Sequence, residues 1–461
     1  MDNFLDKETI CAVSTPPGLG GIAVIRVSGT TSFDLVQKSV KKPLAKQASH
    51  TVHFGKFYDT NNRVIDEVVL TLFKSPHSFT GEDVVEISCH GSTFIQQSII
   101  QCLMAHGARP AEPGEFTMRA FMNQRMDLVQ AEAVADLIAA SSAKSHEIAL
   151  QQMRGGFSKE IEQLRQQLIN FASLVELELD FSEEDVEFAD RTQLYQLVDE
   201  LMRAVRHLVE SFQVGNVLKN GVPVAIIGAP NVGKSTLLNA LLNEERAIVS
   251  EIAGTTRDTI EDELIIAGTS FRFIDTAGIR ETVDQVESIG IKRSYEKAKA
   301  ASAILLLFDL STDSFEHIRE KVSEFEQLID PPQKQLILLF NKTDLAQTGL
   351  LEQCQQAWPK GLFISAKQKQ IDSVLKAFEH FVNKGLLHEG DHIVSNARHH
   401  EALRKTLHAL EEVKSGMDNG ISGDFLAIDI RQALHYLGTI TGAITTDDLL
   451  GNIFSKFCIG K

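Results

Sequence analysis

The sequence predicts a multidomain α/β and α protein, in which a doubly wound, mostly parallel α/β domain is inserted into a split helical domain behind an N-terminal α+β domain. Three observations predict this order of segments. Apolar β runs alternate with helical patterns over residues 216–384. A helical period of three and four residues fills residues 122–215 and returns over residues 385–461. Short β-rich runs and turn clusters occupy residues 1–121, so these four segments are the predicted domains.

Length and composition agree with several folded domains. The 461 residues suggest about three domains, and 43% hydrophobic with 23% charged residues excludes a disordered chain. The net charge of -17 disfavours bulk binding to nucleic-acid phosphates, so a role on nucleic acid would need a basic patch or a partner. The cysteines are scattered, and no apolar run is long enough for a signal core or a membrane span. We therefore expect a cytoplasmic protein without membrane attachment.

The N-terminal segment is predicted to mix strands and helices. Strands are expected at residues 9–14, 22–27, 64–73 and 84–88, and a helix at residues 93–106. The first two strands are separated by Pro16-Pro17-Gly18-Leu19-Gly20-Gly21, which is a strong turn signal.

The two helical segments are amphipathic. Apolar residues spaced by three and four fall on one helix face in each segment: Ile161, Leu164, Leu168, Phe171 and Val175 in the first, and Leu403, Leu407, Leu410 and Val413 in the second. One split helical domain and two separate helical domains give the same pattern, so the periodicity leaves both open.

Between the helical segments, four apolar runs have the length of buried strands: residues 222–227, 271–274, 304–308 and 336–340. Continuous apolar strands that alternate with helices are typical of a parallel sheet covered on both faces.

The loop after the first of these strands has a phosphate-binding motif. Gly228 to Ser235 matches GxxxxGK[ST] and is followed by a helical run. In this context backbone N–H groups surround phosphates, Lys234 reaches the β and γ phosphates, and the Ser235 hydroxyl binds Mg²⁺. The predicted contacts from this loop are Asn231, Val232, Gly233, Lys234, Ser235 and Thr236.

Further motifs follow in the order that a GTPase requires. Asp275-Thr276-Ala277-Gly278 ends a strand, where the aspartate can hold Mg²⁺ through water and the glycine N–H can sense a γ phosphate. Asn341-Lys342-Thr343-Asp344 ends another strand, and the Asp344 carboxylate can accept both N–H donors of the guanine edge. Ser365-Ala366-Lys367 is expected to close over the base, and Thr256 to complete the Mg²⁺ shell. Together these motifs predict a Ras-like P-loop G domain that hydrolyses GTP.

The position after Gly278 departs from the Ras pattern. Ras-like enzymes place a glutamine there to orient the attacking water, whereas this chain has Ile279 followed by Arg280. An isoleucine cannot orient water. Glu281 and Glu287 are the nearby candidates, and each could instead be a solvated loop charge.

Over its length the chain resembles the MnmE (TrmE) family of bacterial tRNA-modification GTPases. The marks of this resemblance are residues 15–18, 21–29, 78–83, 113–116, 127–132 and 254–258, and the terminal Cys458-Ile459-Gly460-Lys461. The resemblance implies that residues 1–121 bind a 5-formyl-tetrahydrofolate-type one-carbon donor and dimerise. It also implies that the two helical segments form one domain, split by the G domain.

The resemblance further assigns site residues. It implies folate contacts at Arg26, Glu82, Arg125 and Lys461, and a catalytic Cys458 that could instead be only an exposed terminal thiol. It implies activation by K⁺ and by G-domain pairing, with Asn231 and backbone oxygens of Ser250, Ile252 and Thr255 around the ion. Glu287 matches the water-positioning glutamate of the family and joins Lys234 as a catalytic residue. The implied nucleotide loop is Ser250, Glu251, Ile252, Ala253, Gly254, Thr255 and Thr256.

The implied function is that of a homodimeric, K⁺-activated GTPase that works with the FAD-dependent protein MnmG. The two would add a carboxymethylaminomethyl or aminomethyl group at C5 of the wobble uridine, U34, in certain tRNAs. One alternative is a signalling or ribosome-assembly GTPase, which shares the G motifs but has no folate site. Another is a non-enzymatic folate-binding scaffold, which the intact Lys234, Ser235, Asp275 and Asp344 disfavour.

Overall fold

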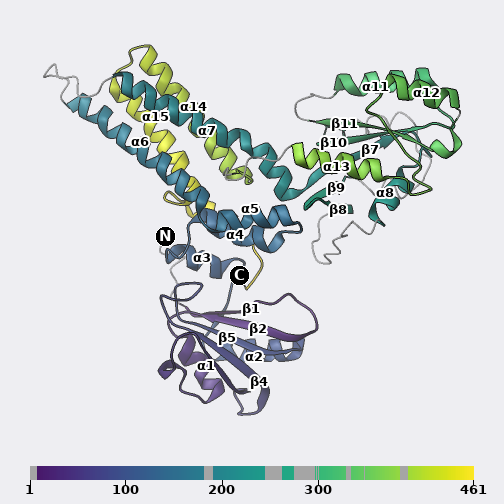
Figure 1. The fold of residues 1–461 in the computed structure, drawn as a ribbon. Coiled ribbons are helices and arrows are strands. Elements are labelled where there is room, and N and C mark those ends of the chain that lie inside the picture. Colours follow the sequence, from purple (N-terminus) through teal and green to yellow (C-terminus); the bar gives the residue numbers. More distant parts are fainter. Residues whose placement is uncertain are drawn as a thin grey trace. The chain divides into compact units, whose positions relative to one another are not determined.

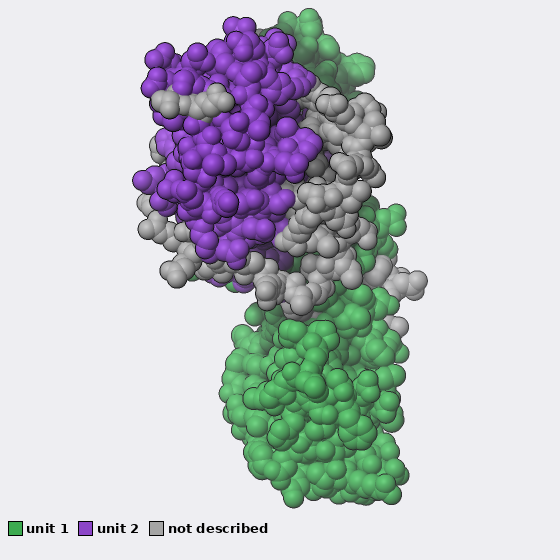
Figure 2. All heavy atoms as spheres, turned by 90° about the vertical axis from the view of Figure 1, so that its right-hand side faces the viewer, with its two compact units in different colours: residues 1–135, 151–201, 405–461 green, residues 136–150, 202–404 purple. Residues whose placement is uncertain are grey.

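The computed structural model describes residues 8–180, 191–243, 262–274, 296, 298–299, 301–328, 334–346, 348–384 and 393–460. The fold confirms the predicted multidomain α/β and α class. The chain forms two compact units, which Figure 2 colours separately. The first unit combines residues 1–135, 151–201 and 405–461, and the second combines residues 136–150 and 202–404. Each unit therefore joins segments that are far apart in the sequence.

The first unit contains a mixed six-stranded sheet in the order β3-β4-β5-β2-β1-β6; Figure 1 labels its strands β1, β2, β4 and β5. Neighbouring strands pair antiparallel, except β1 and β6, which pair in parallel. The strands are β1 (Ile10–Val13), β2 (Gly20–Ser28), β3 (Thr51–Tyr58), β4 (Val64–Phe73), β5 (Val84–Gly91) and β6 (Arg109–Pro110). The strands predicted at 9–14, 22–27, 64–73 and 84–88 are thus present with small changes in their ends.

One face of this sheet carries the core, and part of the other is accessible. Helices α1 (Ser32–Val40) and α2 (Thr93–Ala105), with the short helix η1 (Leu44–Lys46) between α1 and β3, cover the inward side chains of the central strands, such as Leu70 and Ile87. On the other side Val52, Phe54 and Val69 are exposed. This alternation follows from the two-residue period of a strand.

The helical part of the first unit is built on amphipathic faces, as the periodicity predicts. Ile161, Leu168 and Phe171 of α6 (Gly156–Asp180) are fully buried, and α6 packs along α15 (Gly423–Thr441). Helix α16 (Asp447–Phe454) packs against α3 (Glu115–Met122) through a small apolar cluster. The other helices of the helical segments are α4 (Leu128–Ala139), α5 (Ala143–Met153), α7 (Arg191–Asn220) and α14 (Ala397–Asp418).

The second unit contains the predicted doubly wound sheet, in the order β12-β11-β10-β7-β9-β8. All neighbours pair in parallel except β8 and β9. Its strands are β7 (Val222–Gly228), β8 (Asp262–Ile266), β9 (Thr269–Phe273), β10 (Ala303–Asp309), β11 (Gln335–Asn341) and β12 (Leu362–Phe363). Every residue of the central strand β10 is buried, as expected for a parallel strand covered on both sides.

Two layers of helices cover this sheet (Figure 1). Helices α8 (Lys234–Leu242) and α13 (Asp372–Lys384) bury their apolar sides against one face. Helices α11 (Phe315–Leu328) and α12 (Thr348–Ala357) do the same on the other face. Among the helices of the described ranges, none combines the length and the apolar character that crossing a membrane requires.

Candidate functional site

The predicted nucleotide motifs that fall within the described residues lie at one edge of the second sheet. Strand β7 ends at Gly228, β10 at Asp309 and β11 at Asn341, and these three strands are parallel neighbours. Ligands of open α/β sheets bind at the carboxyl ends of the strands. The motifs after β7 and β11 therefore face the same space.

The loop between β7 and α8 has the backbone of a phosphate cradle. Asn231 and Gly233 have positive φ angles of 61° and 105°, and α8 begins at Lys234. The Lys234 ammonium donates to the carbonyl oxygens of Gly228 and Ala229, at 2.7 Å each. The lysine is thus held over the loop, next to the helix N-terminus where anions bind.

Asn341 joins three motifs that are separate in the sequence. Its amide nitrogen donates to the carbonyl of Val232 at 2.8 Å, and its amide oxygen accepts from the backbone N–H of Ala366 at 3.1 Å. A side chain at Gly233 would place its Cβ 2.3 Å from the Asn341 Nδ2 atom. Glycine at position 233 is therefore required by the close approach of Asn341, in the loop predicted to read the base, as well as by its own φ angle.

Asp344 lies in the exposed turn η2 (Thr343–Leu345). The Ser365 hydroxyl donates to Asp344 Oδ1 at 2.7 Å, so the motif predicted to close over the base orients the motif predicted to read it. The carboxylate remains exposed. A fixed, accessible carboxylate suits the two N–H donors of a guanine edge.

Asp309 belongs to this edge, although the sequence reasoning did not single it out. The Lys342 ammonium donates to Asp309 Oδ2 at 2.5 Å, and Ser311 donates to Oδ1 through its backbone N–H at 2.9 Å. Burial alone would raise the pKa of Asp309, but the hydrogen bonds from Lys342 and Ser311 outweigh it and lower the pKa. Its signal in the sequence is the same as that of Asp275, an aspartate at the end of an apolar strand.

Several predicted site residues lie outside the described residues. These are Ser250, Glu251, Ile252, Ala253, Gly254, Thr255, Thr256, Asp275, Thr276, Ala277, Gly278, Glu287 and Lys461. Of the predicted Mg²⁺ ligands, Ser235 is described: it is the second residue of α8 and is partly buried. A hydroxyl oxygen next to a phosphate cradle is a ligand that suits Mg²⁺.

The first unit holds a second polar site, built around Glu115. This buried carboxylate accepts from Arg109 at 2.6 Å, from Arg119 at 2.9 Å and from the backbone N–H of Glu112 at 2.8 Å. Burial acts to raise the pKa of Glu115, but these hydrogen bonds together lower it. Arg119 in turn donates to both carboxylate oxygens of Glu82 at 3.2 Å. Glu82, a predicted folate contact, is thus anchored by a buried ion network that the sequence reasoning missed.

The other described folate candidates lie around the same loop. Arg26 donates to Glu86 at 2.9 and 3.0 Å, and its guanidinium lies 5.1 Å from the ring centre of Phe79. The stem of Arg125 lies against Gly81, the residue before Glu82. Arg26, Glu82 and Arg125 therefore gather along residues 79–86, which run from the loop after β4 into the start of β5.

Within this unit the C-terminal tail lies against the N-terminal sheet and the start of α3. The Ser14 hydroxyl donates to the carbonyl of Gly460 at 3.0 Å, and the Gly114 N–H donates to the carbonyl of Cys458 at 3.4 Å. A Cβ at Gly460 would be 2.2 Å from the Val13 carbonyl oxygen. The tail is thus fitted to the end of β1, while Cys458 is exposed.

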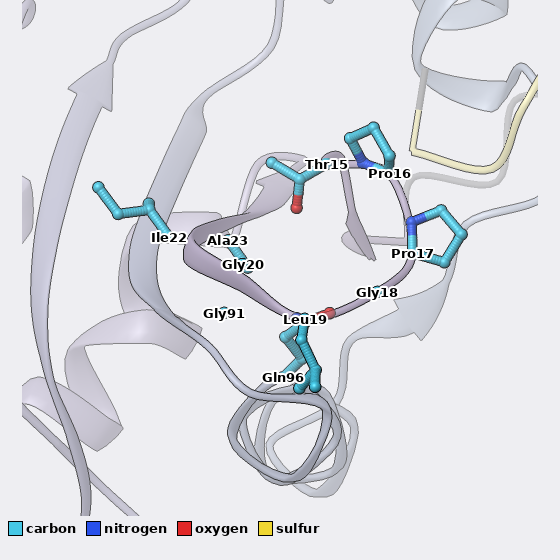
Figure 3. Close-up of a pocket in the computed structure, with 10 residues that line it drawn as sticks. All are labelled: Thr15, Pro16, Pro17, Gly18, Leu19, Gly20, Ile22, Ala23, Gly91 and Gln96. Carbon is cyan, nitrogen blue, oxygen red and sulfur yellow. The ribbon is translucent and has the colours of Figure 1, made fainter. Parts of the chain in front are cut away.

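The loop that follows Ser14 encloses a hollow of about 280 Å³. In Figure 3 the chain from Thr15 to Gly20 curves around this space, and Gln96 of α2 approaches it from below. Leu19, which lines the hollow, is 89% exposed. The residues that line the hollow begin at Thr15, directly after Ser14, whose hydroxyl holds the tail.

Comparison with known proteins identifies relatives over the whole chain. The profile of the MnmE helical domain matches residues 128–458, and that of the GTP-binding protein TrmE N-terminus matches residues 9–125. A tRNA modification GTPase MnmE from Flavobacterium johnsoniae is 54% identical, covering 99% of this chain and 100% of its own length. A protein of the same description from Cytophaga hutchinsonii is 55% identical, with 98% of both chains covered. Among solved structures, Era bound to MgGDPNP and nucleotides of 16S ribosomal RNA is 27% identical over 41% of this chain and 66% of its own, with a TM-score of 0.27.

Proposed function

Because the chain belongs to the MnmE family of tRNA modification GTPases, we propose that it is a K⁺-activated GTPase that modifies C5 of the wobble uridine U34 in certain tRNAs together with the FAD-dependent protein MnmG. The group added is carboxymethylaminomethyl or aminomethyl, and a 5-formyl-tetrahydrofolate-type donor supplies one carbon. The reaction takes place in the cytoplasm, where GTP and tRNA are available.

The observation that carries this proposal is the contact, within the first unit, between the C-terminal tail and the end of β1. Ser14 binds Gly460 although the two residues are 446 positions apart. The alternative, a ribosome-assembly or signalling GTPase, predicts no functional role for the terminal Cys458-Ile459-Gly460-Lys461. The contact therefore favours a second, non-nucleotide site, and Arg26, Glu82, Arg125 and Lys461 are its proposed folate contacts. Charged groups of both signs suit a pterin edge and a glutamate tail.

For hydrolysis, we assign the roles along the edge of the second sheet. Lys234 exchanges its loop carbonyls for the β and γ phosphates, and Ser235 with Thr256 holds Mg²⁺. Asn231, with backbone oxygens of Ser250, Ile252 and Thr255, holds K⁺, which adds positive charge beside the phosphates. Glu287 positions the attacking water in place of the glutamine that Ile279 replaces.

The proposed homodimer uses the open face of the first sheet. Val52, Phe54 and Val69 are 64%, 62% and 37% exposed on β3 and β4, and Phe54 is the register partner of Val69. Burying adjacent apolar side chains against a second copy would stabilise the pair. Phe54→Glu should therefore shift the protein from dimer to monomer in analytical ultracentrifugation, and an unchanged dimer would place the contact elsewhere.

The decisive experiment deletes the gene and measures wobble uridines by mass spectrometry. Loss of the C5 modification, with restoration by the wild-type gene, is the expected result. A variant that lacks residues 458–461 should fail to restore the modification while GTP hydrolysis stays largely intact. Unchanged U34 in the deletion strain would refute the tRNA assignment, and equal loss of both activities in the truncated variant would reduce the tail to a folding element.

The cation proposal has its own measurement, turnover in KCl and in NaCl at equal ionic strength. K⁺ should accelerate hydrolysis strongly, and Asn231→Ala should remove that dependence with little effect on nucleotide binding. Equal rates in the two salts would return Arg280 to consideration as an internal source of positive charge.

A further inference from the structure

The first turns of helix α15 carry apolar side chains on the solvent side. Phe425 is 63% exposed and Ile428 is 49% exposed, and a spacing of three residues puts them on one helix face. Ile421, 46% exposed, precedes them in the turn after α14. We call Ile421, Phe425 and Ile428 the α15 patch.

Local structure explains Ile421 but not the other two. Ser422 is the N-cap of α15, so Ile421 and Leu426 occupy the two positions of a hydrophobic staple. Both approach Gly416, where a Cβ would lie 3.7 Å from Ile421 and 2.7 Å from Leu426. Phe425 and Ile428 have no such role, because they point away from the buried residues Ala427 and Ile430 of the same helix. A phenylalanine left in water forgoes the stabilisation that burial would give.

Acidic side chains surround the patch. Asp424 precedes Phe425, and Asp429 follows Ile428. Burial raises the pKa of Asp429, and the neighbouring Glu412 of α14 raises it further, while His408 opposes the shift. The carboxylates of Asp429 and Glu412 repel each other beside the exposed apolar side chains, which raises the free energy of the folded chain. A cationic partner would relieve this repulsion.

The charge decides between the possible occupants. RNA is disfavoured, because its phosphates would meet Glu412, Asp424 and Asp429. A second copy of this face is disfavoured, because a twofold contact would bring the same carboxylates together. A basic amphipathic helix of another protein satisfies both features, since its apolar side covers Phe425 and Ile428 while its cations meet the carboxylates.

We propose that the α15 patch and its acidic rim dock a basic amphipathic helix of the FAD-dependent partner protein. This inference rests on the proposed function, because it takes MnmG as the occupant. The patch supplies the apolar centre of the contact, and the rim supplies its charge selectivity.

The test measures binding of full-length MnmG to four forms of the chain by titration calorimetry. Phe425→Ser/Ile428→Ser should weaken binding about thirtyfold or more, the size of an interface hot spot. Glu412→Lys should weaken binding severalfold, and the wild-type affinity should fall as NaCl rises at constant KCl. The matched control is Ile138→Ser on α4, where a 51% exposed isoleucine should be replaceable without effect.

Each outcome decides one question. Circular dichroism and urea unfolding of each variant alone report whether the first unit is folded, since residues 405–461 belong to that unit. The exposed charge variant Glu412→Lys keeps the test sound if the double variant folds poorly. If wild type binds MnmG and both patch variants bind within twofold of it, the docking inference is overturned while the partnership stands. If wild type itself does not bind MnmG, the partner assignment in the proposed function fails, and the occupant proposed here fails with it.

Discussion

The nucleotide edge of the second sheet and the Glu115 network of the first unit are both polar sites, but they are built in opposite ways. At the nucleotide edge, loops of three short motifs hold one another through backbone groups, as Asn341 does with Val232 and Ala366. In the first unit, charged side chains from separate elements meet, as Arg119 does with Glu82. A loop held by backbone contacts leaves its side chains available for a ligand. A buried ion network fixes its side chains to one another. Removing one member lowers the stability of the fold strongly, because its partner is left as an uncompensated buried charge.

The largest effect that this comparison predicts is on base choice. Asp344→Asn should lower the preference for GTP over xanthosine triphosphate by about 10⁴, because the buried hydrogen-bonding edge of the base would be mismatched. Competition binding with both nucleotides measures this ratio. Asp372→Asn, which alters an exposed carboxylate at the start of α13, is the control and should leave the ratio unchanged. A retained GTP preference would remove Asp344 from the base-reading role.

The Glu115 network should respond through stability instead of specificity. Glu115→Gln leaves Arg109 and Arg119 without their shared charge and should cost about 3–5 kcal/mol of unfolding free energy in the first unit. Glu67→Gln breaks the exposed Lys56–Glu67 pair of the same unit and should cost less than about 1 kcal/mol. Urea unfolding followed by hydrogen exchange in each unit measures both. GTP hydrolysis should survive as long as the second unit stays folded.

The same substitution has a pH signature. The pKa of Glu115 in the folded chain is lowered from 4.5, mainly because the hydrogen bonds from Arg109, Glu112 and Arg119 overcome burial. The contribution of ionised Glu115 to the free energy of unfolding is therefore fully present above about pH 4.5, and it is lost as pH falls through the pKa of the folded state. The difference between wild type and Glu115→Gln should shrink on acidification. A difference that is constant with pH would mean that Glu115 acts through packing alone.

This contrast explains how much could be predicted from the sequence. The phosphate loop and the base-reading motif are short, and their residues lie at strand ends, so strand prediction was enough to place them together. The fold class was predictable for the same reason, because β10 is a continuous apolar run and α6 has a clear helical period.

Other parts had no local signal. Strand β3 alternates exposed and half-buried residues around a single fully buried Phe57, so its apolar pattern is weak. Arg119 and Glu115 are four apart on α3, which also suits an ordinary surface pair. Only the packing of α3 shows that the pair is buried and reaches Glu82. The contact between Ser14 and Gly460 could not be derived from spacing at all, and the resemblance to a family was the only route to that end of the chain.

A smaller loss of stability is expected where the phosphate loop, at Gly233, contacts the loop that begins at Asn341. Gly233→Ala should cost about 1–3 kcal/mol, because alanine is strained at a φ of 105° and its Cβ would meet Asn341 Nδ2. GTP affinity should fall together with stability, since the two loops separate. Gly349→Ala, in α12, is the control, and it should change stability in the opposite direction. The new Cβ would have no atom within 4 Å. That substitution should stabilise the second unit by about 0.5–1 kcal/mol. Equal effects of the two substitutions would rule out the steric argument.

The smallest effect should appear where the tail meets the first unit. Ser14→Ala removes one hydrogen bond to the Gly460 carbonyl, which is worth about 1 kcal/mol. A local opening of that size speeds amide exchange about fivefold, and the reporter is the Gly114 N–H, which is bonded to the Cys458 carbonyl. Ser455→Ala removes a hydroxyl that donates to the Asn452 carbonyl at the C-terminal end of α16, so it should leave amide exchange at Gly114 unchanged. Faster exchange at Gly114 with unchanged GTP turnover would show that the tail opens independently of the nucleotide edge. If exchange at Gly114 is instead unaltered, the tail is held by the close fit of Gly460 against Val13, and Ser14 is only a neighbour.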